Sequence, residues 1–312
     1  MSSSASRQTQ KFELESSSYP DYRRFQDVET TTFDDEKPML QGQETNTSSS
    51  HVKAYFNEEP LTHVKNKPLL VRLCAPCWPD NKNRLTRKEL KSYNNLREEA
   101  TIKIDPKCED FDHLLRELFE VLTEETLEEI PNDKWKEFGF QNSNPRSDFR
   151  AGGLVALKQL TSFAKNYGKR IKFMVSPANE FFLAISSIYI THYLETYYHI
   201  SSEETPQQGR KELCSRIALK SFCRMLNKDE EAWDLIHQTL LNDLYDTWQR
   251  IRKTVPGVTL LDFGMAQDLI KKKFKKATKA HSFTSFEQLR QVYEKTAIAE
   301  PTKRPSLTAL DH

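Results

Sequence analysis

Residues 135–154 read WKEFGFQNSNPRSDFRAGGL, and this stretch separates two long segments of periodic apolar sequence. It is therefore expected to be an ordered connection inside the fold rather than a terminal tail. Trp135 and Phe140 flank Gly139, and an Asn-Pro turn signal precedes Arg150. Loops that a rigid scaffold holds in place carry function more often than core segments do. The stretch is thus the first place to look for a functional site.

The aromatic residues of this stretch have a simple structural role. Trp135, Phe138 and Phe140 are expected to anchor the long connection to the core, since aromatic side chains bury large apolar surfaces. Gly139 lies between two of them and allows a tight or left-handed backbone. These residues are therefore expected to hold the connection in place.

The second half of the stretch combines an acid, an arginine and a glycine pair. Asp148 is expected to cap the following helix by accepting backbone N–H bonds. Gly152 and Gly153 allow close approach to the backbone, either by the chain itself or by a partner. Arg150 has no apolar role, and its default expectation is a solvated or ion-paired side chain, because few surface residues dominate binding.

The composition excludes several classes of function. The 312 residues suffice for one or two domains, and 37% of them are apolar, which is enough to build a core. The net charge of +1 gives no overall field that would attract nucleic acid. The eight glycines argue against a glycine-rich phosphate loop. The five cysteines lack the spacing of a disulfide framework, as expected in a reducing compartment.

The first 83 residues are expected to lie outside the main domain. Residues 1–50 are rich in Ser, Thr and acids, with 5 Lys and Arg against 9 Asp and Glu, so a disordered tail is predicted. The first residues lack the apolar run of a secretory signal, and we expect a cytoplasmic protein. Residues 51–83 are predicted to be an irregular extended segment that packs on the domain. Cys74 and Cys77 form at most half of a zinc site, because no second cysteine pair follows.

From residue 84 onward, apolar residues recur at helical spacing, and no segment alternates like a half-buried strand. The fold class is therefore predicted to be all-α, with one multi-helix domain over residues 84–298 and a flexible tail over 299–312. A capping box of Thr86 and Glu89 opens the first helix. Further helices are expected over 105–122, opened by Asp105 and Pro106, over 126–130 as a short turn, and over 154–168, 176–194, 214–225, 233–251, 263–279 and 286–297. The expected core includes Phe111, Leu118, Ile185, Trp233 and Leu240.

Two of these segments invite a functional interpretation. Residues 181–194 form the most apolar stretch, but a membrane-spanning helix needs about 20 apolar residues. A buried central helix is therefore predicted there. The segment Lys271–Lys279 begins a basic C-terminal part, with 10 Lys and Arg against 4 acids from residue 271 onward. Such a surface could bind an anionic membrane or an acidic partner, or it could be a solvated helix end.

No set of residues forms a self-contained active site. Asp262, Phe263 and Gly264 match a protein-kinase motif, but the glycine-rich loop, the catalytic loop and the strand lysine of kinases do not accompany it. No Ser/His/Asp or Cys/His set has supporting context, and no cluster has metal-ligand spacing. We therefore expect no cofactor, no metal and no enzyme activity of the chain on its own.

The stretch at 135–154 resembles the signature of the ELMO domain. That signature is a tryptophan, here Trp135, followed by Gly-Phe-Gln, here 139–141, and by Pro-x-x-Asp-Phe-Arg, here 145–150. The similarity covers roughly residues 85–280 and is to stand-alone ELMO domain-containing proteins. It includes the helical segments at 105–119, 181–191, 222–248 and 261–263.

The resemblance implies an activator of small GTPases of the Arf and Arf-like group in their GTP form. In that family the motif arginine, here Arg150, is the proposed arginine finger, which is supplied in trans and stabilises charge on the phosphate oxygens. The residues implied to support the loop or to contact the GTPase are Trp135, Gly139, Phe140, Gln141, Asp148, Phe149, Gly152 and Gly153. The chain departs from the family pattern at Asn144, where an acid is usual, and at Ala151, where a glycine is usual.

Two other functions remain open. The longer ELMO proteins bind Dock-type exchange factors and help to activate Rac without stimulating GTP hydrolysis, and this chain could be a scaffold of that kind. Those proteins carry armadillo-like and pleckstrin-homology regions, for which we expect no room in these 312 residues. The third candidate is a helical adaptor that makes contact through its basic end at Lys271–Lys279.

Overall fold

The computed structural model describes residues 85–105, 107, 109–200, 213–279, 281–299, 301 and 303. Every regular element within these residues is a helix, so the all-α prediction is confirmed. The predictions for the tail 1–50, the segment 51–83 with Cys74 and Cys77, Pro106 and most of the tail 299–312 lie outside the described residues. None of the described helices is both long enough and apolar enough to cross a membrane.

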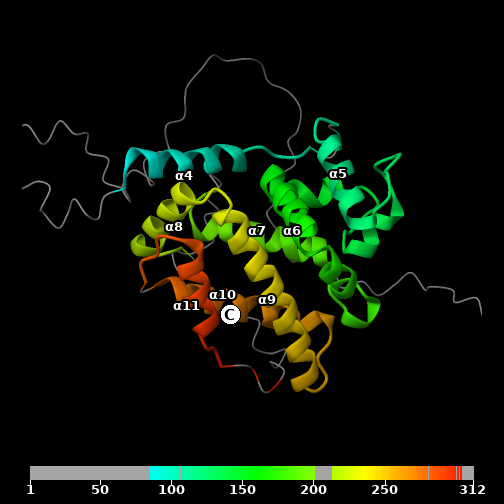
Figure 1. Ribbon diagram of the computed structural model, residues 1–312. Coiled ribbons are helices and arrows are strands. Elements are labelled where there is room, and N and C mark those ends of the chain that lie inside the picture. The colour runs from blue at the N-terminus through cyan, green and yellow to red at the C-terminus, as the bar shows by residue number, and fades with distance from the viewer. Residues whose placement is uncertain are drawn as a thin grey trace, which may run out of the picture. The chain divides into compact units, whose positions relative to one another are not determined.

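The α-helices pack against one another around a shared core (Figure 1). α6 packs against α5, α7 and α9, α4 lies against α8, and α10 packs against both α9 and α11. Two 3-10 helices, η4 and η5, connect α5 to α6, and η5 lies against α6 and α7. In chain order the elements are α4 (Arg87–Ala100), α5 (Asp112–Thr123), η4 (Asp133–Phe138), η5 (Pro145–Arg150), α6 (Gly153–Met174), η6 (Pro177–Asn179), α7 (Leu183–Tyr197), α8 (Arg216–Lys228), α9 (Ala232–Thr254), η8 (Leu260–Asp262), α10 (Gly264–Lys279) and α11 (Phe286–Lys295).

α4 begins where the sequence predicts. The Thr86 hydroxyl accepts the backbone N–H of Glu89 at 3.2 Å, and the Glu89 carboxylate accepts the backbone N–H of Thr86 at 2.5 Å. The capping box is therefore confirmed, and it satisfies two N–H groups that a helix start leaves without partners. Tyr93 on the buried face of α4 donates its hydroxyl to the carbonyls of Tyr198 and His199, at 2.9 and 2.8 Å. This bond ties α4 to the end of α7.

Two predicted helix boundaries before the signature are wrong. α5 begins at Asp112 rather than at residue 105. The Asp105 carboxylate instead accepts the backbone N–H of Lys107 at 2.8 Å, two residues ahead, which closes a local turn and not a helix. Residues 126–130, predicted to be a short helical turn, contain no helix. A single aspartate or a short apolar run carries too little information to place a helix end.

The predicted stop of α6 at Gly168 is also wrong, because the helix continues to Met174. Only Tyr167 departs from helical geometry, with φ of −128°, and it marks a kink. Its ring stacks on Phe163 at a centroid distance of 4.8 Å. Ile171 and Met174 beyond the kink are buried, so burial of the last turns outweighs the helix-weakening effect of one glycine.

α7 is buried around most of its circumference, as predicted for the most apolar stretch. Even its polar residues Ser186, Ser187 and Thr191 are buried, while His192 is only half-buried. The Thr191 hydroxyl donates to Gln159 of α6 at 2.6 Å. Such a bond is needed because an unpaired polar group in the core is costly.

α9 confirms the helix predicted over 233–251, and one face of it is a buried, mostly apolar stripe. The buried residues of this stripe are Trp233, Ile236, His237, Leu240, Leu241, Leu244, Trp248 and Ile251. His237 Nε2 lies 3.0 Å from the Ser187 hydroxyl and 3.2 Å from the Ser187 carbonyl oxygen, and burial lowers the pKa of His237 to about 4. This histidine is neutral at physiological pH and belongs to the core.

Two core predictions need correction. Phe111 and Ile185, expected in the core, are only half-buried. Ile217 lies at the start of α8 with 49% of its surface exposed. At the start of α11, the Gln288 side chain accepts the backbone N–H of Thr284 at 2.9 Å. The remaining core predictions, Leu118, Trp233 and Leu240, are buried.

Candidate functional site

The signature stretch folds into η4 and η5, and an asparagine opens each of them. The Asn132 side chain accepts the backbone N–H of Lys134 at 2.9 Å, and the Asn144 side chain accepts that of Arg146 at 3.2 Å. Asn144 is followed by Pro145, whose fixed φ suits the first helical position. The backbone N–H of Asn132 also donates to the carbonyl of Ser143 at 2.9 Å. The two short helices are therefore joined into one closed segment.

A path of edge-to-face aromatic contacts fixes this segment to α5. Ring centroids are 5.1 Å apart for Phe119 and Trp135, 5.1 Å for Trp135 and Phe140, and 5.7 Å for Phe140 and Phe149. All four rings are buried. The Trp135 indole N–H donates to the carbonyl of Ile130 at 3.1 Å, so its polar atom is satisfied. The structure thus places Trp135, Phe140 and Phe149 in the interior, as anchors and not as contact surface.

Gly139 and Gly153 are required by the backbone itself. Gly139 has φ of +82°, and a Cβ there would lie 2.6 Å from the Phe182 Cα. Gly153 has φ of +56°, and a Cβ there would lie 2.4 Å from the Ile102 carbonyl oxygen. That carbonyl also accepts the backbone N–H of Leu154 at 3.0 Å. The close approach expected at the glycine pair is therefore made by the chain itself.

Asp148 does not cap α6, contrary to the sequence prediction. The N-cap of α6 is the buried Gly152, so no side chain caps this helix. The Asp148 carboxylate points back along the chain and accepts the backbone N–H of Gln141 at 3.0 Å. Burial raises the pKa of Asp148 to about 6, although the Gln141 hydrogen bond and the charge of Arg150 act in the opposite direction. Asp148 thus closes the loop between η4 and η5.

Arg150, the last residue of η5, is exposed. Its Nε donates to the carbonyl of Ser147 at 3.1 Å, one 3-10 turn earlier. Within the described part of the chain, neither terminal nitrogen of its guanidinium forms a hydrogen bond. Gln141 is exposed as well, whereas Trp135, Gly139, Phe140, Asp148, Phe149, Gly152 and Gly153 are buried. The structure therefore separates the predicted site residues into two exposed side chains and a buried support.

Arg146 is a residue that the sequence analysis did not select. Only 8% of its surface is exposed. Its Nε donates to one carboxylate oxygen of Asp112 at 2.9 Å, and its Nη2 donates to both oxygens at 2.5 and 2.6 Å. The two partners lie 34 positions apart, so no local spacing could reveal the pair. Of the two arginines in η5, Arg146 is bound internally and Arg150 is available.

A comparison with known protein families matches residues 94–264, more than half of the chain, to the ELMO/CED-12 family. The chain belongs to the ELMO/CED-12 family. The matched range contains the whole signature and ends at the first residue of α10. It begins within α4 and includes α5 to α9, with η4 and η5 between α5 and α6.

Two curated relatives carry the same domain name. ELMO domain-containing protein C of Dictyostelium discoideum is 21% identical over 175 residues, which are 56% of this chain and 28% of that protein. ELMO domain-containing protein A of the same organism is 27% identical over 99 residues, which are 31% of this chain and 10% of that protein. This chain therefore spans less than a third of either relative.

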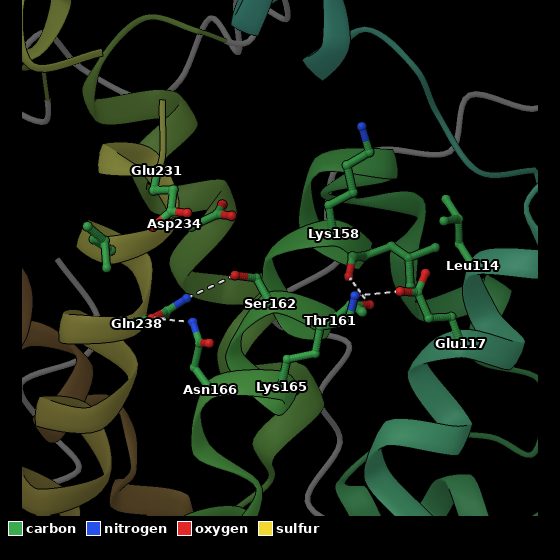
Figure 2. A pocket seen from close by; sticks show the side chains of 12 residues that line it. Leu114, Glu117, Lys158, Thr161, Ser162, Lys165, Asn166, Glu231, Asp234 and Gln238 are labelled. Atoms are coloured by element: carbon green, nitrogen blue, oxygen red, sulfur yellow. Dashed lines mark hydrogen bonds and ion pairs between the residues drawn. The ribbon is translucent and has the colours of Figure 1, made fainter. Parts of the chain in front are cut away.

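A separate cavity of about 420 Å³ lies among residues of α5, α6 and α9 (Figure 2). Several of the polar side chains that line it are bonded to one another. Lys165 pairs with Glu117 at 2.5 Å, and the Gln238 amide donates to the Ser162 hydroxyl at 3.0 Å. Burial raises the pKa of Asp234 to about 6, against the hydrogen bond from Ser162. The cavity includes no residue of η4 or η5.

The basic end of α10 is partly tied to its neighbours. Lys273 pairs with Asp243 at 2.8 Å and lies 4.3 Å above the Tyr293 ring. Lys271 pairs with Asp268 at 3.2 Å, and Lys276 donates to a backbone carbonyl of the chain at 3.0 Å. In the described structure, the side chains without such a partner are those of Lys272, Lys275 and Lys279. No group of three or more His, Cys, Asp or Glu among the described residues could hold a metal ion.

Proposed function

We propose that this ELMO domain activates GTP hydrolysis by a small GTPase of the Arf or Arf-like group, and that Arg150 enters the active site of the GTPase. The observation that carries the proposal is the state of the Arg150 side chain. It is exposed, its Nε is held by the carbonyl of Ser147, and its terminal nitrogens face no partner within the described residues. The helix that presents it is anchored by buried aromatic rings.

The chemistry of phosphoryl transfer explains why one arginine suffices. Negative charge spreads over the phosphate oxygens in the transition state, and a guanidinium that arrives from a second protein stabilises it. Such a residue accelerates hydrolysis by about 10³–10⁵-fold, which corresponds to ~4–7 kcal/mol of barrier. Arginine suits this role because its planar fork contacts two oxygens and stays charged. The bond from Nε to Ser147 orders part of the side chain before the partner arrives, which lowers the entropy cost.

The two departures from the family pattern leave the backbone of the site intact. Asn144 caps η5 by accepting the backbone N–H of Arg146, a role that an acidic side chain fills equally well. Ala151 has φ of −73° and ψ of −41°, a conformation open to every residue, so no glycine is required there. These substitutions therefore give no reason to expect loss of activity. Gln141, the other exposed signature residue, is proposed to contact the GTPase surface beside Arg150.

The decisive test is single-turnover GTP hydrolysis by a panel of GTP-loaded Arf-family GTPases, with and without this chain. At least one GTPase should respond, and Arg150→Ala should lower the stimulated rate by about 10³-fold. Binding of Arg150→Ala to the GTP-loaded partner should change far less, because the finger acts mainly in the transition state. Arg290→Ala is the matched control, since Arg290 is exposed and bonded only within its own helix.

Two results would contradict the proposal. Full stimulation by Arg150→Ala would show that this arginine is not the finger. A panel without any response, together with binding of a Dock-type exchange factor, would favour the scaffold function.

A further inference from the structure

The ion pair between Arg146 and Asp112 joins the start of η5 to the start of α5. Three hydrogen bonds of 2.5–2.9 Å make it bidentate, and the side chains retain 10% and 19% of their exposure. A bidentate pair of this kind fixes the plane of the guanidinium as well as its position. Asp112 also lies in the first turn of α5, where the helix dipole favours a negative charge.

From this pair a short series of bonds leads to Arg150. The Asn144 side chain accepts the backbone N–H of Arg146, and the Ser147 hydroxyl donates to the Asn144 carbonyl at 2.9 Å. The Ser147 carbonyl then accepts the Nε of Arg150. In a 3-10 helix, side chains three positions apart lie on the same side. Arg150 therefore emerges above Ser147, while the neighbouring Arg146 is directed to α5.

The ion pair adds a restraint that the aromatic contacts do not provide. Phe149 packs on Phe140 and fixes the buried side of η5, but a ring contact permits rotation about the contact. A bidentate bond at a second point of the same turn removes this freedom. Buried ion pairs often contribute little net stability compared with apolar replacements, so orientation is the more natural role for this one.

We propose that Arg146 is a positioning residue, and that its bond to Asp112 sets the orientation in which η5 presents Arg150 to the phosphate of a partner GTPase. This inference rests on the proposed function, because it assigns the orientation a use in catalysis. It adds to that function a second arginine, which acts through the backbone of η5 and makes no contact with the nucleotide. A wrongly oriented guanidinium still meets the GTPase but stabilises the transition state poorly.

The test compares Asp112→Asn, Arg146→Met and the double variant in the 312-residue chain. Each single variant leaves one largely buried charge without its counter-charge, so its melting temperature should fall. The double variant removes both charges together and should recover most of that loss. The positioning role predicts that the maximal stimulated hydrolysis rate nevertheless stays about 10- to 100-fold low in all three. The concentration for half-maximal stimulation should remain within about twofold of the wild-type value.

Asp246→Asn serves as the control. It removes the charge from another arginine–aspartate pair, more exposed than the first, in which Nη2 of Arg170 of α6 donates to both oxygens of Asp246 of α9 at 2.7 and 2.8 Å. This variant should leave the maximal rate unchanged. A double variant of Asp112 and Arg146 that recovers stability and rate together would overturn the proposal, because the pair would then be only structural.

Amide hydrogen exchange over residues 141–151 separates this inference from the proposed function. If the double variant has the same melting temperature as the wild type but exchanges faster in this segment, the result supports the orienting role. Unchanged exchange there would overturn it, even if no GTPase responds to the wild-type chain. A lack of response by every GTPase contradicts the proposed function itself and leaves the exchange result to decide the role of the ion pair.

Discussion

η5 and the basic end of α10 are both cationic, yet they hold their charges in different ways. In η5, Arg146 is buried against Asp112, and Arg150 is held at one nitrogen only. In α10, the partly buried Lys271 and Lys273 carry the intramolecular ion pairs. The unpaired cations of α10 are long lysine side chains, with Lys272 and Lys279 exposed and Lys275 half-buried, whereas the unpaired cation of η5 lies on an anchored turn. Only η5 presents a charge in a defined place.

The difference indicates what each surface can do. A fixed guanidinium suits a role that depends on geometry to within about an ångström, such as transition-state stabilisation. Scattered ammonium groups suit a diffuse attraction, such as that of an anionic membrane, where position matters little. Total charge in the sequence favours α10, but geometry favours η5 as the functional site.

Replacing Arg150 by lysine should have the largest effect. Lysine keeps the charge but loses the planar fork and the Nε that bonds Ser147. Arg150→Lys should therefore stimulate GTP hydrolysis almost as poorly as Arg150→Ala, about 10³-fold below the wild-type chain. Single-turnover hydrolysis by the responsive GTPase measures this. A lysine variant within tenfold of the wild-type rate would show that charge alone suffices and that the fixed geometry of η5 is unimportant.

Trp135→Ala should produce the next largest effect, on stability. Its indole is fully buried, contacts Phe119 and Phe140, and donates to Ile130. Removing a buried aromatic ring costs about 3–5 kcal/mol of unfolding free energy. Urea unfolding monitored by circular dichroism gives the value.

Arg150→Ala is the control for this measurement, since a surface arginine contributes less than about 0.5 kcal/mol. Equal stability of Trp135→Ala and wild type would mean that η4 is not held by its aromatic anchor. The aromatic anchor would then not explain why η5 holds its charge in a more defined place than α10 does.

Asp148→Asn should change how stability depends on pH. The folded pKa of Asp148, about 6, lies above the ordinary value of 3.8. The wild-type fold therefore binds a proton more tightly than the unfolded chain between pH 4 and 6. Its unfolding free energy should fall as pH rises through this window, by up to ~1.4 kcal/mol per pH unit, and should then level off. The Gln141 N–H and the charge of Arg150 favour the carboxylate, and the pKa of about 6 already includes their opposing effect.

Asparagine cannot titrate but still offers an oxygen to the Gln141 N–H. The stability of Asp148→Asn relative to wild type should therefore rise from pH 4 to pH 6 and stay constant above it. Thermal unfolding at half-unit pH steps measures the difference. A constant difference across the window would show that Asp148 ionises as an exposed aspartate does, and that the loop it closes is open to water.

The sequence predicted best those elements whose period extends over many residues. The stripe of α9 runs through five turns, and each of its residues is buried. The apolar run of α7 likewise predicted a buried helix. Helix ends depend on single side chains, and two of the predicted ends are wrong. Asp105 closed a turn instead of a helix, and Gly168 did not end α6, because Ile171 and Met174 are buried beyond it.

The candidate site shows the same limit. Its anchors and glycines follow from residue type, since buried aromatic rings and left-handed glycines leave clear signals in the sequence. The Arg146 pair does not, because its partner lies 34 positions away. The position of Asp148 before α6 predicts a helix cap, but its carboxylate accepts the backbone N–H of Gln141, seven residues earlier. Contacts of this kind, with a distant residue or with an earlier turn of the chain, arise from tertiary packing and cannot be predicted from residue spacing.

The smallest effect per substituted residue is expected for membrane binding by the lysines of α10. If this surface binds anionic membranes, changing Lys272, Lys275 and Lys279 to glutamine should weaken binding to phosphatidylserine vesicles. Each exposed lysine contributes about 1 kcal/mol near such a surface, and the binding should also fall with added salt. The melting temperature should not change, because these side chains have no partner among the described residues. Vesicle co-sedimentation measures the binding.

The matched control changes Lys271, Lys273 and Lys276 to glutamine, which removes the same charge from the same helix. This variant should lose stability, because Lys273 bonds Asp243 and lies over Tyr293, which joins α9, α10 and α11. Its vesicle binding should change less, since these ammonium groups are already held by the protein. Binding that responds neither to the first set of substitutions nor to salt would show that the basic end of α10 is a solvated helix end. The two cationic regions would then differ in kind, with a function only at η5.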